Sequence, residues 1–329
     1  MIVDCQSHVF PAAYADLLTR SRSDTLRATG GDGVYTLEYG PAGDAPIQRF
    51  TLRLDEYSIP RKLADMDAAG VDVSVLSVNI PSPDWLEPAL ACAGAQICND
   101  FLAEVCSRHP GRFVGLASLP LPDVDAAVAE LDRALDDLGL RGVFLCSHLN
   151  GLLLDARELE PFYAHVARRG IPLVLHPAVP AWGAVLRDHA MIPMLGFMVE
   201  TSIAMLRLIL GGVLDRHPTL QVVHPHAGGV LPYLMGRVEE QTEVKGRGRE
   251  FIAQRPGAYY ERVYLDLVSP SPLALQFAYD FAGPERLLFG SDHPWVGIPA
   301  ILDLVHGRGW PADALARILE HNARELFRL

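Results

Sequence analysis

The sequence predicts an α/β fold, a (β/α)8 TIM barrel with a small insertion after the first strand. Short apolar runs recur along the chain, and each is followed by a longer segment with helical periodicity, which is typical of parallel strands with helical crossovers. The chain has 329 residues, of which 50% are hydrophobic, enough to bury one large core. No linker or internal repeat divides the chain, so we expect a single domain over residues 1–329.

Eight of the apolar runs have the length and composition of buried parallel strands. They are Ile2–Asp4, Val71–Ser77, Phe113–Ser118, Gly142–Cys146, Pro172–His176, Gln221–His224, Val263–Leu267 and Leu287–Gly290. The intervening periodicity predicts helices over Pro60–Ala69, Ala89–His109, Val124–Leu138, Glu158–Arg169, Ile203–Gly211 and Pro311–Phe327.

One stretch, from about Ser21 to Glu56, interrupts this alternation. It is rich in Gly, Asp, Thr and Arg and contains an alternating run over Val34–Tyr39, which predicts a small hairpin insertion. Loops that follow barrel strands lie at the catalytic face. The insertion is therefore expected to cover the active site, and a surface excursion without a role is the alternative.

Composition and charge favour small-molecule chemistry. The formal net charge of -12 provides no basic surface for nucleic acid or anionic membranes, so neither partner is expected. The N-terminus has no secretory signal pattern, and no stretch of 18 uninterrupted apolar residues suggests a membrane span, so we expect a cytoplasmic protein. The five cysteines form no CxxC pair, which argues against disulfides and a thiolate zinc site.

Polar residues stand at the carboxyl ends of four predicted strands. His8 follows the first strand, His176 ends the fifth, His226 follows the sixth and Asp292 follows the eighth. Each alone has a structural alternative, a hydrogen-bonded core histidine or a helix N-cap. Because barrel enzymes gather their catalytic groups at this face, the set together indicates a site for zinc or a related divalent ion.

Several motifs carry a resemblance to a known family. They are Met66–Asp72 leading to Val75–Ser77, Arg112–Ala117 with Leu119–Pro120, Gly142–Val143, Ser147–Asn150, Glu200–Thr201, Gly211–Leu214, His226–Pro232 and Leu288–Pro294. With them, the chain resembles the 2-amino-3-carboxymuconate-6-semialdehyde decarboxylase branch of the amidohydrolase superfamily over nearly its full length. The resemblance implies a TIM-barrel enzyme that uses one divalent metal ion, Zn²⁺ with Mn²⁺ as the alternative, and that forms a homodimer.

The same resemblance implies roles for individual residues. His8, His176 and Asp292 would hold the metal, and His226 would act with Asp292 in catalysis as an unliganded general acid or base. The departure is Gln6, which stands where the family has the first histidine of a His-x-His pair and where related hydroxybenzoate decarboxylases place Glu. Three alternatives remain for this weaker ligand. Gln6 ligates the metal through oxygen, it leaves its place to water or substrate, or the site has lost metal affinity.

Further residues are expected to bind substrate. The resemblance suggests an arginine that grips a substrate carboxylate, a group suited to bidentate pairing with guanidinium, and Arg53 and Arg61 are the candidates, with solvated side chains as the alternative. His293, Trp182 and Trp295 lie near the ligand positions in sequence. They are expected as pocket walls, although ordinary packing or helix capping explains them equally well.

These residues together predict a metal-dependent decarboxylase of a small unsaturated or aromatic carboxylate. The metal would polarise the substrate, and His226 would move the proton. One alternative is a metal-dependent hydrolase of a lactone, amide or C–C bond, because one barrel hosts both reactions. A second, motivated by Gln6, is a metal-free barrel that binds without catalysis.

Overall fold

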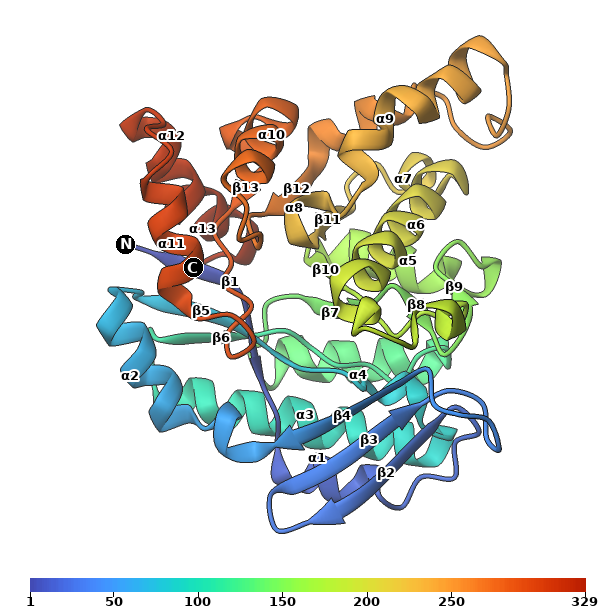
Figure 1. Cartoon of the computed structure of the whole chain (residues 1–329), viewed down its shortest axis with the longest axis vertical. Helices are drawn as coiled ribbons and strands as arrows, with labels where there is room; N and C mark the ends of the chain where they lie inside the picture. Colours follow the sequence, from blue (N-terminus) through green and yellow to red (C-terminus); the bar gives the residue numbers. More distant parts are fainter.

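The computed structural model describes all residues, 1–329 (Figure 1), and confirms the α/β barrel. Eight parallel strands form two sheets, ordered β1-β5-β6 and β13-β12-β11-β10-β7. Bridges between Ala117 and Val143 and between Ser7 and His293 join the two sheets into a closed ring. The barrel strands are β1 (Val3–Val9), β5 (Val73–Val78), β6 (Phe113–Gly115), β7 (Val143–Cys146), β10 (Pro172–His176), β11 (Gln221–His224), β12 (Val263–Asp266) and β13 (Leu287–Leu288).

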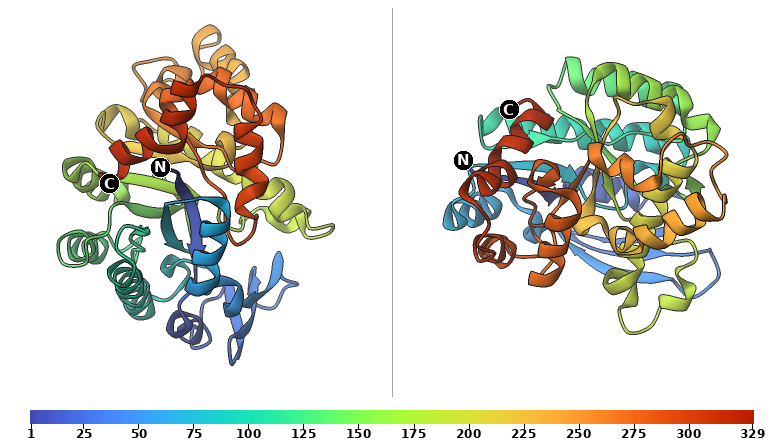
Figure 2. Two further views of the ribbon diagram at one scale, coloured as in Figure 1. Left: turned by 90° about the vertical axis from the view of Figure 1, so that its left-hand side faces the viewer. Right: turned by 90° about the horizontal axis from the view of Figure 1, so that it is seen from above.

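Helices surround the ring on its outside (Figure 2), except the short α8, which follows the carboxyl end of β11. They are α1 (Ala12–Leu18), α2 (Ile59–Ala69), α3 (Pro88–Arg108), α4 (Val124–Asp136), α5 (Glu160–Arg169), α6 (Phe197–Leu210), α7 (Val213–Arg216), α8 (Pro225–Gly228), α9 (Leu231–Glu239), α10 (Pro272–Ala282), α11 (Ile298–His306), α12 (Ala312–Ala316) and α13 (Asn322–Phe327). The sequence missed α1 and α7 to α11. Helix α6 begins earlier than predicted, because buried polar residues Glu200, Thr201 and Ser202 obscure its apolar pattern.

The first strand is longer than predicted. β1 continues through Gln6 and His8 to Val9, and every residue in it is buried. The polar side chains that the sequence placed after the strand therefore lie on it. The strand also shifts register against β5 between Asp4 and Ser7, an irregularity of the kind that redirects side chains next to active sites.

The insertion is a three-stranded antiparallel sheet, not the hairpin that the sequence predicted. Its strands are β2 (Leu26–Gly31), β3 (Val34–Tyr39) and β4 (Gln48–Arg53). Asp32 and Gly33 both have positive φ in the turn between the first two strands, as a two-residue hairpin loop requires. The sheet lies outside the barrel at one end (Figures 1 and 2). Arg187 donates to the carbonyl oxygens of Ala45 and Pro46 and so ties the loop before β4 to the segment after β10.

One helical stretch, Ile192–Leu210, is long and apolar enough to cross a membrane by length and composition alone. Half of that stretch is buried within the protein. The core helix of a soluble protein passes the same test, so this feature is weak evidence for a membrane partner.

A buried carboxylate fixes the turn after β13. Asp4 on β1 accepts hydrogen bonds from the backbone nitrogen of Ser291 at 2.9 Å and from its hydroxyl at 2.6 Å. The same hydroxyl accepts a bond from the backbone nitrogen of His293 at 3.1 Å. Burial raises the pKa of Asp4 to about 6, against the lowering effect of the Ser291 bonds. Ser291 thus fixes the backbone on both sides of Asp292.

We expect Ser291→Ala to lower the free energy of unfolding by about 1.5–3 kcal/mol, because it removes a hydrogen bond to a buried carboxylate. The matched control is Ser74→Ala on the neighbouring strand, whose buried hydroxyl has no hydrogen-bond partner. Chemical denaturation of chelator-treated protein measures both changes. Equal effects of the two substitutions would contradict the assigned role of Ser291.

Candidate metal centre

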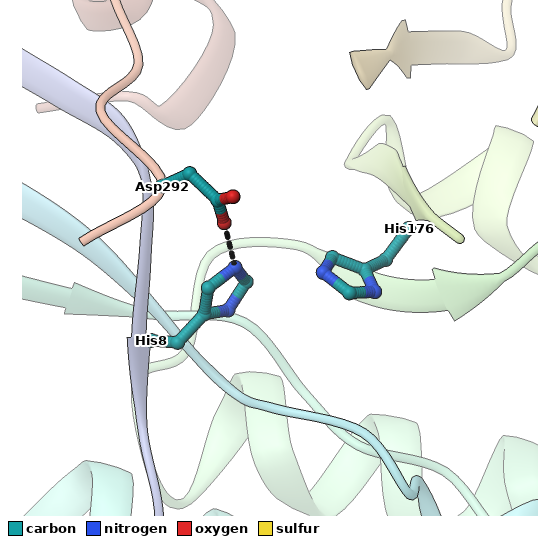
Figure 3. A group of neighbouring side chains, drawn as sticks. All are labelled: His8, His176 and Asp292. Atoms are coloured by element: carbon teal, nitrogen blue, oxygen red, sulfur yellow. Dashed lines mark hydrogen bonds and ion pairs between the residues drawn. The ribbon is translucent and has the colours of Figure 1, made fainter. Parts of the chain in front are cut away.

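Three side chains from distant parts of the chain converge at the carboxyl ends of the barrel strands (Figure 3). They are His8 on β1, His176 at the end of β10 and Asp292 in the turn after β13. Their potential ligand atoms all lie within 4.8 Å of one another. The closest pair is His8 Nε2 and Asp292 Oδ1, 3.0 Å apart.

Neighbouring groups orient the two imidazoles. His176 Nδ1 donates to the carbonyl oxygen of Pro177 at 2.9 Å, and His8 Nδ1 is hydrogen-bonded to Ser77 Oγ at 2.9 Å. Each ring therefore keeps Nε2 for the common centre, the arrangement that metal-binding histidines adopt. Two neighbouring ligand atoms about 2.1 Å from one ion are spaced roughly 3.0 Å apart in octahedral geometry and roughly 3.4 Å apart in tetrahedral geometry. The residues present thus fit one divalent cation.

Gln6 provides a second test of this fit. The side chain is 4% exposed, and neither its Oε1 nor its Nε2 has a hydrogen-bond partner within the protein. An unpaired buried amide costs about 1–3 kcal/mol, so this position calls for a partner. A cation or an ordered water would satisfy the oxygen, so the role of Gln6 as a metal ligand stays a prediction.

His226 and His8 face different carboxylate oxygens of Asp292. The backbone of His226 is in the left-handed region, with φ of 57° and ψ of 52°, and its amide nitrogen donates to Asp266 Oδ1 at 2.7 Å. Its Nε2 is 3.8 Å from Asp292 Oδ2, and Asp292 itself has a φ of 65°. Such strained residues persist where the surrounding structure holds them, often at active sites. Asp266 is therefore the residue that supports the His226 turn.

Burial and charge set the protonation of the centre. Burial lowers the pKa of His176 well below its ordinary value, and the His8 charge adds to this effect. Burial alone would raise the pKa of Asp292, but His226 and His8 hold it well below the usual range. Burial opposes protonation of His226, yet the interactions with Asp292 and Asp266 raise its pKa. A neutral histidine and an ionised carboxylate are the states that bind a metal.

A cavity of about 1400 Å³ opens beside these residues, and His176, His226 and Asp292 contribute to its lining. Of the expected substrate-binding residues, Trp295 lines it, edge-to-face with Phe50 at a ring distance of 6.0 Å.

The two arginines expected to grip substrate lie outside this cavity. Arg53 is 51% exposed and faces Asp55 and Glu56, while Arg61 pairs with Asp65 one helical turn away. Both sit on surface elements where acidic neighbours in sequence are the nearest partners. Arg49 and Arg187, which the sequence analysis did not single out, line the cavity instead.

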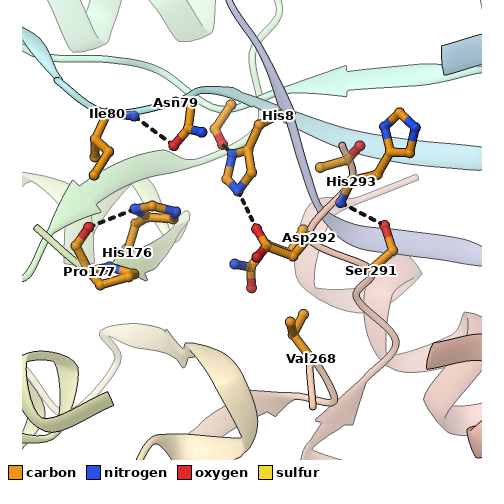
Figure 4. A network of polar contacts seen from close by, with 12 residues as sticks. His8, Asn79, Ile80, His176, Pro177, Val268, Ser291, Asp292 and His293 are labelled. Atoms are coloured by element: carbon orange, nitrogen blue, oxygen red, sulfur yellow. Dashed lines mark hydrogen bonds and ion pairs between the residues drawn. The ribbon is translucent and has the colours of Figure 1, made fainter. Parts of the chain in front are cut away.

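His293 and Trp182 also lie outside the cavity lining. The His293 ring points away from His176 (Figure 4), toward Lys62 Nζ at 2.7 Å and Asp65 Oδ2 at 2.9 Å. Trp182 donates its indole N–H to Glu200 at 2.6 Å. Sequence proximity did not determine direction, because the chain turns at Asp292, which has φ of 65°, and because Trp182 lies six residues beyond His176.

The sequence analysis did not identify Ser77 and Lys62, two residues that contact the site residues. Ser77 ends a predicted strand, a signal that could have marked it as a partner for His8. Lys62 had no such signal, because a lysine on an amphipathic helix normally faces solvent. It is 1% exposed, bonds Ser7 Oγ at 2.6 Å, and burial lowers its pKa to about 8 against nearby carboxylates.

A parallel barrel with two imidazoles and a carboxylate at the carboxyl ends of its strands, and a third imidazole beside them, is the architecture of a metal-dependent enzyme. Comparison with known proteins agrees with this class. The chain belongs to the amidohydrolase family, whose profile matches residues 3–329.

Its relatives include decarboxylases of the branch that the motifs indicated. The chain is 31% identical over 286 residues to a gamma-resorcylate decarboxylase of Rhizobium radiobacter, covering 82% of this chain and 86% of that protein. It is 31% identical over 240 residues to the 2-amino-3-carboxymuconate-6-semialdehyde decarboxylase of Dictyostelium discoideum, covering 71% and 66%. A crystal structure of a dihydroxybenzoic acid decarboxylase from Polaromonas sp. JS666, with bound manganese and 2-nitroresorcinol, matches with a TM-score of 0.83 and 25% identity over 100% of this chain and 97% of that one.

We expect purified protein to carry about one divalent ion per chain and His176→Ala to lose it, because the variant removes a ligand atom. Gln6→Ala should weaken metal affinity about tenfold or more, and Gln6→Glu should strengthen it by adding charge. Elemental analysis and metal titration measure these effects, with His165→Ala, which pairs with Asp132 outside the centre, as the control. Full metal content in His176→Ala would refute the proposed ligand set.

Proposed function

We propose that this chain is a metal-dependent decarboxylase of an aromatic carboxylate. The observation that carries the proposal is the convergence of His8, His176 and Asp292 beside His226. All of these except His8 line the cavity. The relatives named as decarboxylases of aromatic acids support the reaction class. No residue in this centre favours hydrolysis of a lactone, amide or C–C bond over decarboxylation.

We also propose which metal ion the site holds. The sequence favoured Zn²⁺ over Mn²⁺ on the family's imidazole-rich site. With Gln6 in place of a histidine, the donor set holds two imidazoles and up to two oxygens, and oxygen ligands suit Mn²⁺ better than imidazole does. The manganese bound in the Polaromonas enzyme supports the same choice. We therefore propose Mn²⁺ as the working ion, with Zn²⁺ as the competitor.

His8, His176 and Asp292 would hold the metal, which would supply a Lewis acid for the substrate carboxylate. The centre itself is buried, since His8 is 1% and His176 6% exposed. Burial excludes water from the reacting carbon and strengthens every charge interaction around it. The ring of the substrate then lies in the cavity, along the side that His226 shares with Asp292.

His226 moves the proton in this proposal. In its protonated form it delivers the proton to the ring carbon that bears the carboxylate. The bond to the carboxylate then breaks, carbon dioxide leaves, and the bonding electrons return to the ring. Asp292, 3.8 Å from His226 Nε2, stabilises the charged imidazole, and Asp266 fixes the turn that aims it.

We expect 2,6-dihydroxybenzoate or a related hydroxybenzoate to release carbon dioxide in the presence of the protein. Chelation should abolish the release, and Mn²⁺ should restore it more fully than Zn²⁺ if oxygen donors set the preference. Carbon dioxide is measured alongside the phenol product by chromatography. Turnover of lactones or amides, with no carbon dioxide from any aromatic acid, would instead identify a hydrolase.

We expect His226→Gln to lower kcat about 10²- to 10⁴-fold while the metal content stays at the wild-type level, because His226 moves the proton without holding the metal. His165→Gln, at the barrel exterior, is the control. In D2O the wild type should place deuterium on the product ring carbon. An unchanged kcat in His226→Gln would remove this residue from the mechanism.

A further inference from the structure

One buried cation lies behind the metal centre and takes no part in the proposed reaction. Lys62 on α2 is 1% exposed. Its Nζ donates to Ser7 Oγ at 2.6 Å and to His293 Nδ1 at 2.7 Å, and the carbonyl oxygen of His293 lies at 3.4 Å. An ammonium group has three donors and no acceptor, so its three N–H groups match these three acceptors.

The same contacts fix the hydrogen bonds of His293. Lys62, with a pKa of about 8, is mostly protonated at pH 7 and can only donate. Nδ1 of His293 therefore accepts, and its Nε2 donates to Asp65 Oδ2 at 2.9 Å. The His293 ring thus connects the buried ammonium group to a carboxylate on the same helix, and its side chain is held at both nitrogens.

Both residues that Lys62 binds are chain neighbours of proposed metal ligands. Ser7 precedes His8 on β1, and His293 follows Asp292 in the turn after β13. The two segments meet here, since the backbone nitrogen of His8 donates to the carbonyl oxygen of His293 at 2.8 Å and Ser7 forms a β-bridge with His293. Lys62 therefore spans the seam across which His8 Nε2 and Asp292 Oδ1 face each other at 3.0 Å.

The turn after β13 depends on contacts at both of its ends. Asp292 has a φ of 65°, a strained conformation that persists only where the surrounding structure holds it. Asp4 holds the turn before Asp292, through Ser291. Lys62 holds it after Asp292, through His293. Without Lys62 the second end of the turn loses the side-chain contact that ties it to β1.

We propose that Lys62 is a positioning residue of the metal centre, which sets the spacing of His8 and Asp292 by binding Ser7 and His293. This inference rests on the proposed metal centre and adds a residue that touches neither metal nor substrate. Position and charge act in opposite directions here. A nearby positive charge repels a divalent cation, so loss of the charge alone tightens metal binding, whereas loss of the position weakens it.

The test is the affinity for Mn²⁺, measured by titration with electron paramagnetic resonance of the free ion. In Lys62→Met, which keeps the length of the side chain and removes its donors, we expect the dissociation constant to rise about tenfold. Lys62→Arg, which keeps a charged donor, should recover part of the loss. The control is Arg108→Met on α3, where Arg108 is 72% exposed and pairs with Glu104. An unchanged or lower dissociation constant in Lys62→Met would overturn the inference.

A second measurement separates positioning from a general effect on stability. Chemical denaturation of chelator-treated Lys62→Met gives its loss of stability without metal. A residue that only stabilised the fold would show this loss while the folded variant kept the wild-type affinity for Mn²⁺, and that result would contradict the proposal. If Lys62→Met does not fold, Ser7→Ala takes its place, because it removes one of the two contacts and leaves the charge. We expect its dissociation constant to rise about two- to tenfold, and no rise would overturn the inference.

A crystal structure of chelator-treated Lys62→Met separates this inference from the proposed metal centre. It gives the distance between His8 Nε2 and Asp292 Oδ1 without any metal. A distance longer than in the wild type, combined with no Mn²⁺ binding by the wild type, supports the positioning of this pair by Lys62 and overturns the metal centre. Equal Mn²⁺ binding by wild type and Lys62→Met, at an unchanged distance, keeps the metal centre and overturns the inference.

Discussion

The carboxylate of Asp292 is the group on which the whole centre depends. One of its oxygens meets His8 Nε2 at 3.0 Å, and the other faces His226 Nε2 at 3.8 Å. These contacts link the strand that begins the barrel to the turn that ends it and to His226, the residue that we propose moves the proton. Asp292 holds this place with a φ of 65°, and Asp4 fixes the strained turn through Ser291. The contacts that join the first strand to the turn after the last strand therefore also assemble the site.

Around this centre, strands and loops have separate tasks. The strand ends and the short turns after them place the ligand atoms, each with a partner that fixes its direction, as Ser77 does for His8. Helices α9 and α10 and the insertion loop shape the cavity and contribute few charged groups. Such a division lets one barrel keep its chemistry while its substrate changes.

The features that could be predicted from the sequence are those that a local pattern of residues determines. All eight barrel strands were located, and β10 and β11 coincide with their predicted bounds. Residues that follow a strand end in a parallel barrel converge by topology, so His8, His176 and Asp292 could be proposed together. Which residues line a cavity depends on the whole fold. Arg53 and Arg61 pair with acidic residues two to four positions away in sequence and do not enter the cavity. His293 faces Lys62 and Asp65, which only the folded chain brings near, and the cavity is lined by segments more than 200 residues apart. The third strand of the insertion was missed because Phe50 and Leu52 are the only apolar residues that alternate along β4.

We propose that one divalent ion lies among His8, His176 and Asp292, with Gln6 at its side. A crystal structure of the protein grown with Mn²⁺, with anomalous data collected near the manganese edge, would locate this ion. We expect a single strong anomalous peak about 2.0–2.3 Å from Nε2 of both histidines and from a carboxylate oxygen of Asp292. No peak at this position at saturating Mn²⁺, or a peak held by other residues, would contradict it.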